Sequence, residues 1–448
     1  VGMAIAVWEL TAAIALIVMA KYFLPLFLEK KIYTMPQFLE QRFDKSVSLV
    51  LSFFWLIVYI FINLTSVLWL GSLAINALTG LDLFYGLVVL AIFSLAYSLS
   101  GGLKAVAMTD VVQVVLLIFG GLAVSFIALN TISESTGVVN GMKIVFDQMP
   151  EKFDMILSSD NPSYKNLPGI WILFGLGVWI GHFFYWGFNQ YITQRALGAK
   201  SIKEAQKGVM FAAYLKLLMP IVIVLPGICA AILFPVLEKS DQAYPTMMSL
   251  LPNGLLGLTF AALIAAIVSS LASMSNSIST IFTMDIYRYF KGEEHNQASL
   301  IKVGRYTVVI SLLIATLIAK PLLGSFESIF QYIQNFTGYF SPGIVVIFLV
   351  ALFWKKATSM SVLIAALISL FASVLISLIY PDLPFIHRMT IVFVLSAIGC
   401  WYTSYLQGYK DQSKSIDLSS INFSTSKSFN FNTCVIVFVL AIIYITLA

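Results

Sequence analysis

Long apolar runs separated by short polar stretches dominate the chain, and most of them are long enough to cross a bilayer as helices. A membrane-spanning helix needs about 20 mostly apolar residues, because its backbone must satisfy its hydrogen bonds internally in lipid. The pattern therefore predicts an all-α membrane protein. It indicates twelve spans, at about residues 4–27, 48–78, 83–99, 104–130, 168–190, 208–235, 253–286, 303–320, 328–354, 358–380, 384–407 and 430–448.

The basic residues between these spans indicate how the protein is oriented in the membrane. If the loops alternate between the two sides, 18 of the 26 Lys and Arg residues lie on one side and six on the other, with Lys21 and Lys216 inside spans. Cytoplasmic loops are rich in Lys and Arg, so we expect the richer side to be cytoplasmic and the C-terminus to lie outside. The long polar segment 131–167 is then an extracytoplasmic loop, and its turn signals predict some local structure.

Composition supports the lipid bilayer as the main environment. The chain is 60% hydrophobic and 10% charged, whereas soluble domains carry about 25% charged residues. The net charge of +5 is spread over the loops, so we predict no nucleic-acid partner. Cys229, Cys400 and Cys434 lie apart without a CxxC pair and predict no zinc site. No catalytic motif is present, and we expect a protein that is not an enzyme.

One apolar run carries a stripe of small and hydroxyl-bearing residues. Steps of three, four and seven place on one helix face Ala266, Ser269, Ser270, Ser273, Ser277 and Thr280. Hydroxyl and carbonyl oxygens suit a hard monovalent cation such as sodium, and a neutral ligand set avoids the cost of burying a carboxylate. The alternative is close helix packing, with each hydroxyl bonded to its own helical turn.

Four ionisable residues inside spans are candidates for a functional site, since charges are costly at membrane depth. Glu9 could accept hydrogen bonds from a polyhydroxylated substrate while Lys216 donates them, and the alternative is a structural ion pair. Asp110 follows a Gly-Gly pair, so a helix N-cap is its alternative role. His182 stands alone, and interior histidines without a ligand are common.

Two further spans carry groups that could line a cavity. The run 168–190 combines glycines with aromatic residues, which permits a broken helix in which Tyr185 or Trp186 stacks on the apolar face of a sugar. In the ninth span, Gln331 and Gln334 are three residues apart and are expected on one face, where their amides could both donate to and accept from hydroxyls. Hydrogen bonds between helices are the alternative for both glutamines.

Four strings of the sequence resemble the sodium/solute symporter family, within its sodium/glucose cotransporter group: GGLKAVAMTDVVQ, YWGFNQYITQRALGAKSIKEAQKG, AAIVSSLASMSNSISTIFTMDIY and FQYIQNFTGYFSPGI. The resemblance implies a leucine-transporter-like core of two inverted five-helix repeats, with alternating access around a site at the membrane midplane. A sugar-transporting relative has fourteen spans, and the twelve here match its third to fourteenth. We therefore expect the chain to be incomplete and to lack the first core helix.

The same resemblance implies one transmembrane transporter domain over residues 1–448. Residues 1–130 are the remainder of the first repeat, 131–167 the extracytoplasmic loop, 168–354 the second repeat and 355–448 additional C-terminal helices. It also implies roles for individual residues. The sodium ligands are Ala266, through its carbonyl, with Ser269 and Ser270, and Asp110 lies on the sodium route. The substrate-binding residues are Glu9, His182, Lys216 and Gln334, the inner gate is Tyr185, and the outer lid is formed by Trp8 and Phe330.

The function predicted in this way is sodium-coupled symport of a hexose, galactose or glucose, in a multi-pass protein of the plasma membrane, specifically a bacterial inner membrane. The sequence departs from a sodium/galactose symporter of the group at His182, where the relative has Asn, at Ala12, where it has a sugar-facing Ser, and at Phe184, where it has Tyr. These departures leave other solutes open, such as myo-inositol, an amino acid or sialic acid. A transporter-like sensor or scaffold is a third alternative.

Overall fold

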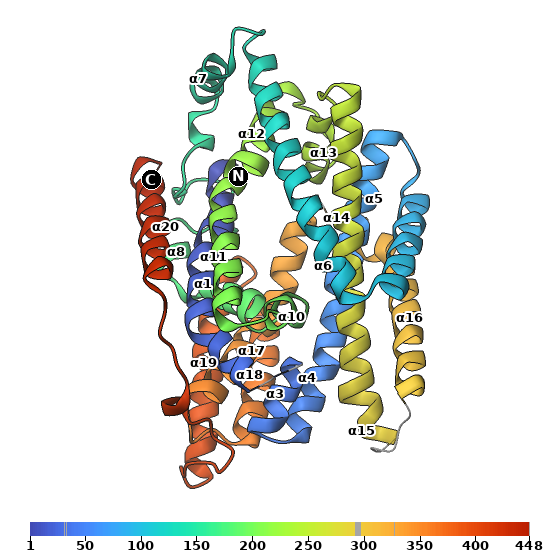
Figure 1. The fold of residues 1–448 in the computed structure, drawn as a ribbon. Helices are drawn as coiled ribbons and strands as arrows, with labels where there is room; N and C mark the ends of the chain where they lie inside the picture. The colour runs from blue at the N-terminus through green and yellow to red at the C-terminus, as the bar shows by residue number, and fades with distance from the viewer. Residues whose placement is uncertain (31, 33, 292–296, 327, 448) are drawn as a thin grey trace.

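The computed structural model describes residues 1–448 except 31, 33, 292–296, 327 and 448, and it gives no side-chain surroundings for 100–107 and 420. All the regular secondary structure in the described residues is helical. Ten of the described helical stretches are long and apolar enough to cross a membrane: Gly2–Glu29, Lys45–Thr79, Met108–Ile132, Ile202–Leu233, Asn253–Lys291, Gln297–Leu323, Ile329–Phe353, Ser359–Ile379, Phe385–Leu406 and Lys427–Thr446. Many of them lie side by side, with their axes running in the same general direction (Figure 1).

The first part of the chain forms two helices that each contain a π-helical turn. The turns η2 and η3 widen the backbone without ending the helix, so that η1 to α2 and α4 to α5 are continuous. The helix that ends with α5 stops at Gly80, whose φ of +73° suits a left-handed cap. The elements up to residue 152 are η1 (Gly2–Ala6), α1 (Val7–Val18), η2 (Met19–Phe23), α2 (Leu24–Glu29), α3 (Met35–Arg42), α4 (Lys45–Ile57), η3 (Val58–Leu64), α5 (Thr65–Thr79), α6 (Leu83–Ile132), α7 (Val138–Gln148) and η4 (Pro150–Lys152).

The second part of the chain contains three more π-helical turns, η5, η6 and η8. The last two of these again continue a long helix. The elements are α8 (Trp171–Phe174), α9 (Leu176–His182), η5 (Phe183–Gly187), α10 (Gln190–Leu197), α11 (Ile202–Met219), η6 (Pro220–Val224), α12 (Leu225–Leu233), η7 (Ser240–Gln242), α13 (Ala243–Met248), α14 (Asn253–Thr280), η8 (Ile281–Tyr287), α15 (Arg288–Lys291), α16 (Gln297–Leu323), α17 (Ile329–Phe353), α18 (Ser359–Ile379), α19 (Phe385–Leu406), η9 (Leu418–Ser420) and α20 (Lys427–Thr446).

The prediction of twelve spans is not confirmed. The run 83–99 forms an apolar helical stretch that is shorter than a full span and continues into the next run as part of α6. The run 168–190 is divided among α8, α9 and η5, none of which is long enough to cross a bilayer alone. The other ten predicted runs correspond to the ten stretches given above.

Helix α6 corrects the expected turn between the third and fourth runs. Its backbone is helical for 50 residues, and the helix changes direction sharply along its length instead of ending (Figure 1). Asp110 therefore lies inside a helix, and its alternative interpretation as an N-cap is wrong. The Gly-Gly pair lies inside this continuous helix, because two glycines weaken a helix by only about 1 kcal/mol each and do not have to end it.

The expected break in the run 168–190 is present at Gly175. This residue has extended backbone, with ψ of 153°, between α8 and α9. Two residues later, Gly177 lies so close to α19 that a Cβ atom would be 2.3 Å from the carbonyl oxygen of Ile386. The glycine-rich sequence thus permits both the break and the close approach of α9 to α19.

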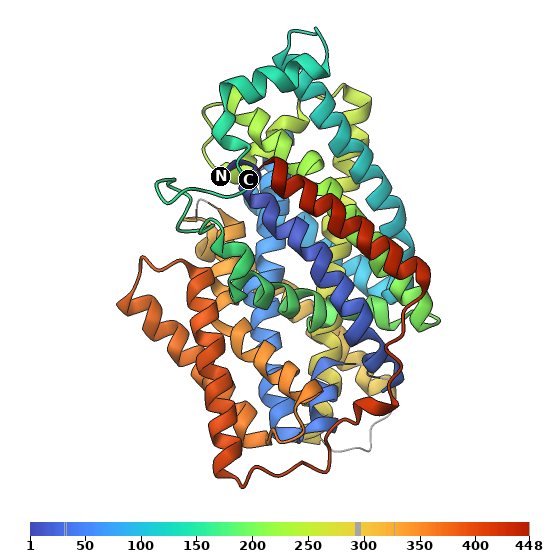
Figure 2. The ribbon, with the colours of Figure 1, turned by 90° about the vertical axis from the view of Figure 1, so that its left-hand side faces the viewer.

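Pairs of long helices surround the interior where these breaks and π-turns occur. Helix α1 packs along α11, α14 along α6, and α17 against both α18 and α19. Helix α20 lies against α11 and α1 on the outside (Figure 2). The broken segment of α9 and η5 contacts α1, α17 and α19, so it crosses the centre of the molecule.

Helix α17 is held at both ends by charged side chains from distant segments. At its N-terminus, Asp241 accepts a hydrogen bond from the backbone of Ile329 at 2.8 Å. At its C-terminus, Arg42 donates to the carbonyls of Ala351 and Trp354 at 3.2 and 3.0 Å. An anion at the N-terminus and a cation at the C-terminus both complement the helix dipole, so these contacts stabilise the position of α17.

Candidate functional site

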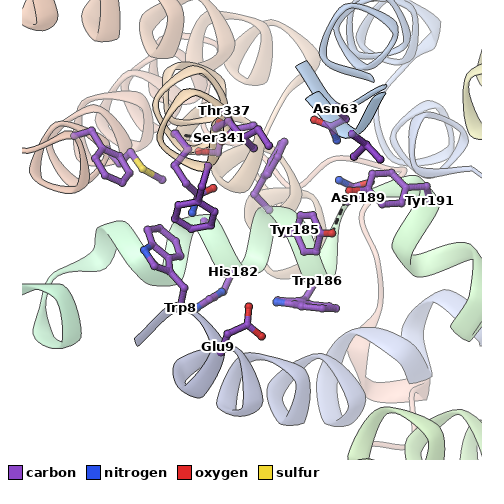
Figure 3. A pocket seen from close by; sticks show the side chains of 18 of the residues that line it. Trp8, Glu9, Asn63, His182, Tyr185, Trp186, Asn189, Tyr191, Thr337 and Ser341 are labelled. Atoms are coloured by element: carbon purple, nitrogen blue, oxygen red, sulfur yellow. Dashed lines mark hydrogen bonds between the residues drawn. The ribbon is translucent and has the colours of Figure 1, made fainter. Parts of the chain in front are cut away.

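A central cavity lies where α1, α9, α11 and α17 meet, and its volume is about 310 Å³. Its wall contains all seven residues predicted to bind the substrate or to gate access: Trp8, Glu9, His182, Tyr185, Lys216, Phe330 and Gln334. Those labelled in Figure 3 project from different helices toward the same space. The structure therefore brings together residues that are far apart in the sequence, while their roles remain predictions.

Glu9 and Lys216 form an ion pair across the cavity wall between α1 and α11. Lys216 Nζ donates to Glu9 Oε2 at 2.5 Å, and the two side chains are 18% and 33% exposed, respectively. The ammonium also lies 4.8 Å from the ring centroid of Trp186, a cation–π distance. Among the described residues, Glu9 Oε1 has no hydrogen-bond partner. The pair can thus stabilise the two helices and still offer an acceptor and donors to a ligand.

His182 is the last residue of α9 and is only 4% exposed. Its Nε2 lies 2.7 Å from the hydroxyl of Thr11, on α1. Its ring packs edge-to-face with the rings of Trp8 and Trp179, with centroid distances of 5.8 and 6.3 Å. The hydroxyl of Thr11 and the two Trp rings therefore hold the imidazole of His182 in place. His182 is also part of the cavity wall.

Aromatic rings close the cavity near the two groups predicted as gates. Trp8 packs edge-to-face on Phe330 at 6.2 Å and stacks on Phe385 at 6.2 Å, so α19 adds a third ring to the expected lid. Tyr185 packs edge-to-face on Trp186 at 4.9 Å, and its hydroxyl accepts a hydrogen bond from Tyr191 at 3.2 Å. These aromatic contacts can close the cavity at the two predicted gates. A change of side-chain rotamer can open it.

Several polar residues of the cavity wall were not among the predicted ones. Three of their side-chain atoms are buried and have no hydrogen-bond partner in the part of the chain that the structure describes: Asn63 Oδ1, Asn189 Nδ2 and Ser341 Oγ. Asn189 Oδ1 accepts a hydrogen bond from Tyr59 at 2.7 Å, which fixes its orientation. Asn63 could have been found, because a lone amide in the apolar string YIFINLTS is as unusual as Gln334. Asn189 follows a π-turn, and no sequence signal marks it.

The two glutamines of α17 do not share a role. Gln334 lines the cavity, whereas Gln331 is exposed and outside the cavity wall. The backbone of Gln331 instead belongs to the helix start, where it donates to Ser328. The two amides therefore do not line the cavity together, although residues three apart lie on the same side of a helix.

The stripe on α14 divides into two kinds of hydroxyl. Ser277 donates to the carbonyl of Ser273 at 3.1 Å and Thr280 to that of Asn276 at 2.8 Å, which is the back-bonded arrangement. Ser269 instead donates to the carboxylate of Asp110 on α6. Ser270 is exposed, and Ala266 is half-buried. Among the hydroxyl contacts of the stripe within the described residues, Ser269 and Ser273 thus bond to other helices, whereas Ser277 and Thr280 bond to their own helical turn.

Asp110 links this part of the stripe to a third helix. Its Oδ2 lies 2.8 Å from Nη2 of Arg195, on α10, and the same Nη2 donates to Ser273 at 2.7 Å. A carboxylate and hydroxyls are the oxygen ligands that hard cations prefer, so the chemistry fits a sodium ion. No group of three or more His, Cys, Asp or Glu side chains able to hold a metal occurs in the described residues.

A helical protein with ten candidate spans, a central polar cavity, aromatic closures and an oxygen-rich stripe has the architecture of a membrane transporter for small solutes. The chain belongs to the sodium:solute symporter family, whose model matches residues 1–369. Its members are symporters, which carry solutes across membranes together with an ion.

Individual relatives agree with this assignment. The chain is 45% identical over 462 residues to a sodium/glucose cotransporter of Vibrio parahaemolyticus, covering 99% of this chain and 85% of the relative. It is 31% identical to the human sodium/myo-inositol cotransporter 2, covering 79% of this chain and 56% of that protein. Its fold is similar to that of a Na⁺-coupled sialic acid symporter in a substrate-bound outward-open state, with a TM-score of 0.76 and 23% identity over 90% of this chain and 84% of the other.

Proposed function

We propose that the protein is a sodium-coupled symporter of a hexose, glucose or galactose, in the plasma membrane. The single observation that carries the proposal is the cavity in which the Glu9–Lys216 pair lies with His182 and Gln334. The similarity to a sodium/glucose cotransporter at 45% identity supports the choice of solute.

A hexose matches this cavity by its hydrogen-bonding pattern. Each hydroxyl of a sugar both donates and accepts, so it needs partners of both kinds. Glu9 supplies acceptors, Lys216 donors, and Gln334 one of each. The volume of about 310 Å³ lies at the lower end of the range of small-molecule sites, about 300–1,000 Å³, which suits a monosaccharide better than a larger glycan. Trp186 and Tyr185 provide aromatic faces for the apolar face of the ring.

Sodium binds at Ala266, Ser269 and Ser270 in this proposal, and Asp110 lies on its route. The Ser269–Asp110 contact supports it, because the carboxylate reaches the stripe. Arg195 pairs with Asp110 in this arrangement, so entry of a sodium ion exchanges one cation partner of the carboxylate for another. A neutral ligand set with one nearby carboxylate lets a monovalent ion bind and leave.

Transport follows by alternating access between two inverted repeats, formed by residues 1–130 and 168–354, with 131–167 as an extracytoplasmic loop and 355–448 as additional helices. Trp8 and Phe330 close the outer side and Tyr185 the inner side. Sodium and sugar are coupled because each stabilises the conformation that binds the other, and this coupling free energy is reciprocal. The membrane potential supplies about 2.3 kcal/mol per charge per 100 mV in addition to the sodium gradient.

Uptake into proteoliposomes tests the proposal. Labelled galactose or glucose is offered with an inward sodium gradient, and the same gradient of choline is the control. We expect the labelled hexose to accumulate only with sodium, and we expect unlabelled hexose to reduce this accumulation by competition. Uptake that is equal in choline rejects sodium coupling. Competition by myo-inositol, sialic acid or amino acids, but by no hexose, rejects the sugar.

A further inference from the structure

The hydroxyl of Thr11 lies between two polar atoms, deep in the wall behind the cavity. Thr11 is on α1 and is 2% exposed. Its Oγ1 lies 2.5 Å from the carbonyl oxygen of Val7, one turn earlier, and 2.7 Å from Nε2 of His182. Both distances are hydrogen-bond distances, so Thr11 joins the backbone of α1 to the imidazole of α9.

The hydroxyl of Thr11 has one proton, and the partner to which it donates this proton determines which nitrogen of the imidazole must carry a hydrogen. A carbonyl oxygen can only accept, so the contact of 2.5 Å between Val7 O and Thr11 Oγ1 requires that Thr11 donates to it. The hydroxyl then has no proton left to donate to His182, so its oxygen must accept a hydrogen bond from the N–H at Nε2. We infer that Thr11 is a positioning residue that holds His182 as the Nε2–H tautomer and leaves Nδ1 as a hydrogen-bond acceptor at the cavity.

The surroundings of the ring are consistent with a neutral imidazole. His182 is buried among the rings of Trp8 and Trp179, and the cavity that it lines already holds the ammonium of Lys216. A second cation in this small space would be repelled and poorly solvated. In the neutral ring one nitrogen donates and the other accepts, and no described residue bonds to Nδ1.

This assignment deepens the proposed function and rests on it, because it specifies a group on the solute. A bare Nδ1 accepts from a solute hydroxyl and cannot donate to it. The site therefore selects a solute with a hydroxyl donor at this position and discriminates against a deoxy or fluoro analogue. An amide at the same position could do either, since Asn carries both a donor and an acceptor. His182 therefore discriminates more strongly than an Asn would between a solute that has a hydroxyl donor at this position and an analogue that lacks it.

The tautomer is measured directly by nitrogen NMR of protein labelled with ¹⁵N-histidine. His182→Asn identifies the signal among the three histidines of the chain. We expect a protonated Nε2 and a bare Nδ1 in the wild type and in Thr11→Ser, which keeps the hydroxyl. In Thr11→Val, which keeps the shape but loses the hydroxyl, the signal should shift toward the other tautomer. A protonated Nδ1 in the wild type, or an unchanged signal in Thr11→Val, overturns the inference.

Transport of sugar analogues supplies the second measurement. A set of deoxy- and fluorohexoses is compared with the parent hexose by KM in the wild type, Thr11→Ser and Thr11→Val. We expect one hydroxyl whose loss raises KM about tenfold, as for one hydrogen bond in a buried site. That ratio should shrink in Thr11→Val and persist in Thr11→Ser. Equal ratios in all three proteins contradict the inference, even if each transports hexose.

The two measurements separate the failure of this inference from the failure of the proposed function. The NMR experiment needs no solute, so a bare Nδ1 with no uptake of any hexose would reject the sugar and keep the assignment of Thr11. Uptake of hexose with a protonated Nδ1 would keep the proposed function and reject the assignment. Thermal unfolding of the three variants shows whether each is folded, and Thr11→Ser serves as the matched control if Thr11→Val is destabilised.

Discussion

Lys216 Nζ lies 2.5 Å from Glu9 Oε2, and this ion pair joins α11 to α1 at the wall of the cavity. Both groups face the space where the proposed solute binds, so the pair is expected both to hold the two helices together and to bind the ligand. The contributions to stability and to ligand binding can be measured separately by removing one charge and then both. Breaking a buried pair leaves an uncompensated charge, which costs more than replacing the whole pair.

Glu9→Gln is expected to lower the stability of the protein by roughly 1–3 kcal/mol, less than the 3–5 kcal/mol of a fully buried pair because the cavity admits solvent. It should also raise KM for hexose, because Gln offers one acceptor where the carboxylate offered two oxygens. Adding Lys216→Met should restore much of the stability and none of the uptake. Thermal unfolding and uptake of the two single variants and the double variant form the double-mutant cycle. Recovery of uptake in the double variant contradicts a ligand-binding role.

Ser269→Ala is expected to raise the sodium concentration for half-maximal uptake by roughly fivefold to tenfold, the effect of one hydrogen bond or ligand. The reason is that its hydroxyl is directed to Asp110 instead of to its own turn. Ser277→Ala is the matched control on the same helix, because that hydroxyl is bonded to the carbonyl of Ser273. Sodium titrations of uptake measure both. Equal shifts in the two variants would mean that loss of any serine on the stripe has the same effect.

The hydrophobic pattern predicted ten spans well because a bilayer imposes length and composition on each helix separately. The pattern predicted helix ends wrongly where the hydropathy and the actual end of the helix do not coincide. At the Gly-Gly pair the backbone stays helical, whereas at Gly175 it leaves the helix inside an apolar run. Both places contain glycine, and glycine permits either outcome, so packing against neighbouring helices decides between them.

The candidate site was predictable to a different extent. Rare polar residues in apolar runs, together with the family resemblance, indicated seven of the residues in the cavity wall. Their partners could not be predicted, because the contacts join distant helices. Nothing in the sequence near Asp110 indicates Arg195, and nothing near His182 indicates Thr11. The choice between the two roles of the α14 hydroxyls also depended on a neighbouring helix, since Ser269 and Ser277 have the same spacing and chemistry.

Gly177→Ala is expected to destabilise the protein by roughly 1–3 kcal/mol, the usual cost of overpacking. A Cβ at this position would lie 2.3 Å from the carbonyl oxygen of Ile386, so α9 and α19 must separate. Gly208→Ala on α11 is the control, because nothing lies within 4 Å of its Cβ position. That change should be neutral or stabilising, since Ala is favoured over Gly in a helix by about 1 kcal/mol. Thermal unfolding measures both, and similar midpoints for the two variants would contradict the close approach.

Asp241 gives the protein a pH dependence of a specific sign. Its carboxylate accepts from the backbone of Ile329 at 2.8 Å at the start of α17. Burial raises the pKa of Asp241 above its usual value, although the Ile329 N–H and Lys239 act in the opposite direction. A group with a raised folded-state pKa contributes stability that is present below the unfolded pKa, about 3.9, and lost as the pH rises through the folded value.

Asp241→Asn keeps an acceptor for Ile329 without the charge, so its stability relative to the wild type should increase as the pH rises through this window and then stay constant. Asp382→Asn is the control of opposite sign. Asp382 is exposed and lies 2.8 Å from Lys165, which lowers the pKa of its carboxyl. Its contribution is present above the unfolded pKa and lost as the pH falls. Thermal midpoints of the three proteins, measured from below the lowered pKa of Asp382 to above the raised pKa of Asp241, show both trends. If the two variants follow the same trend, the buried cap of α17 does not behave as an acid with a raised pKa.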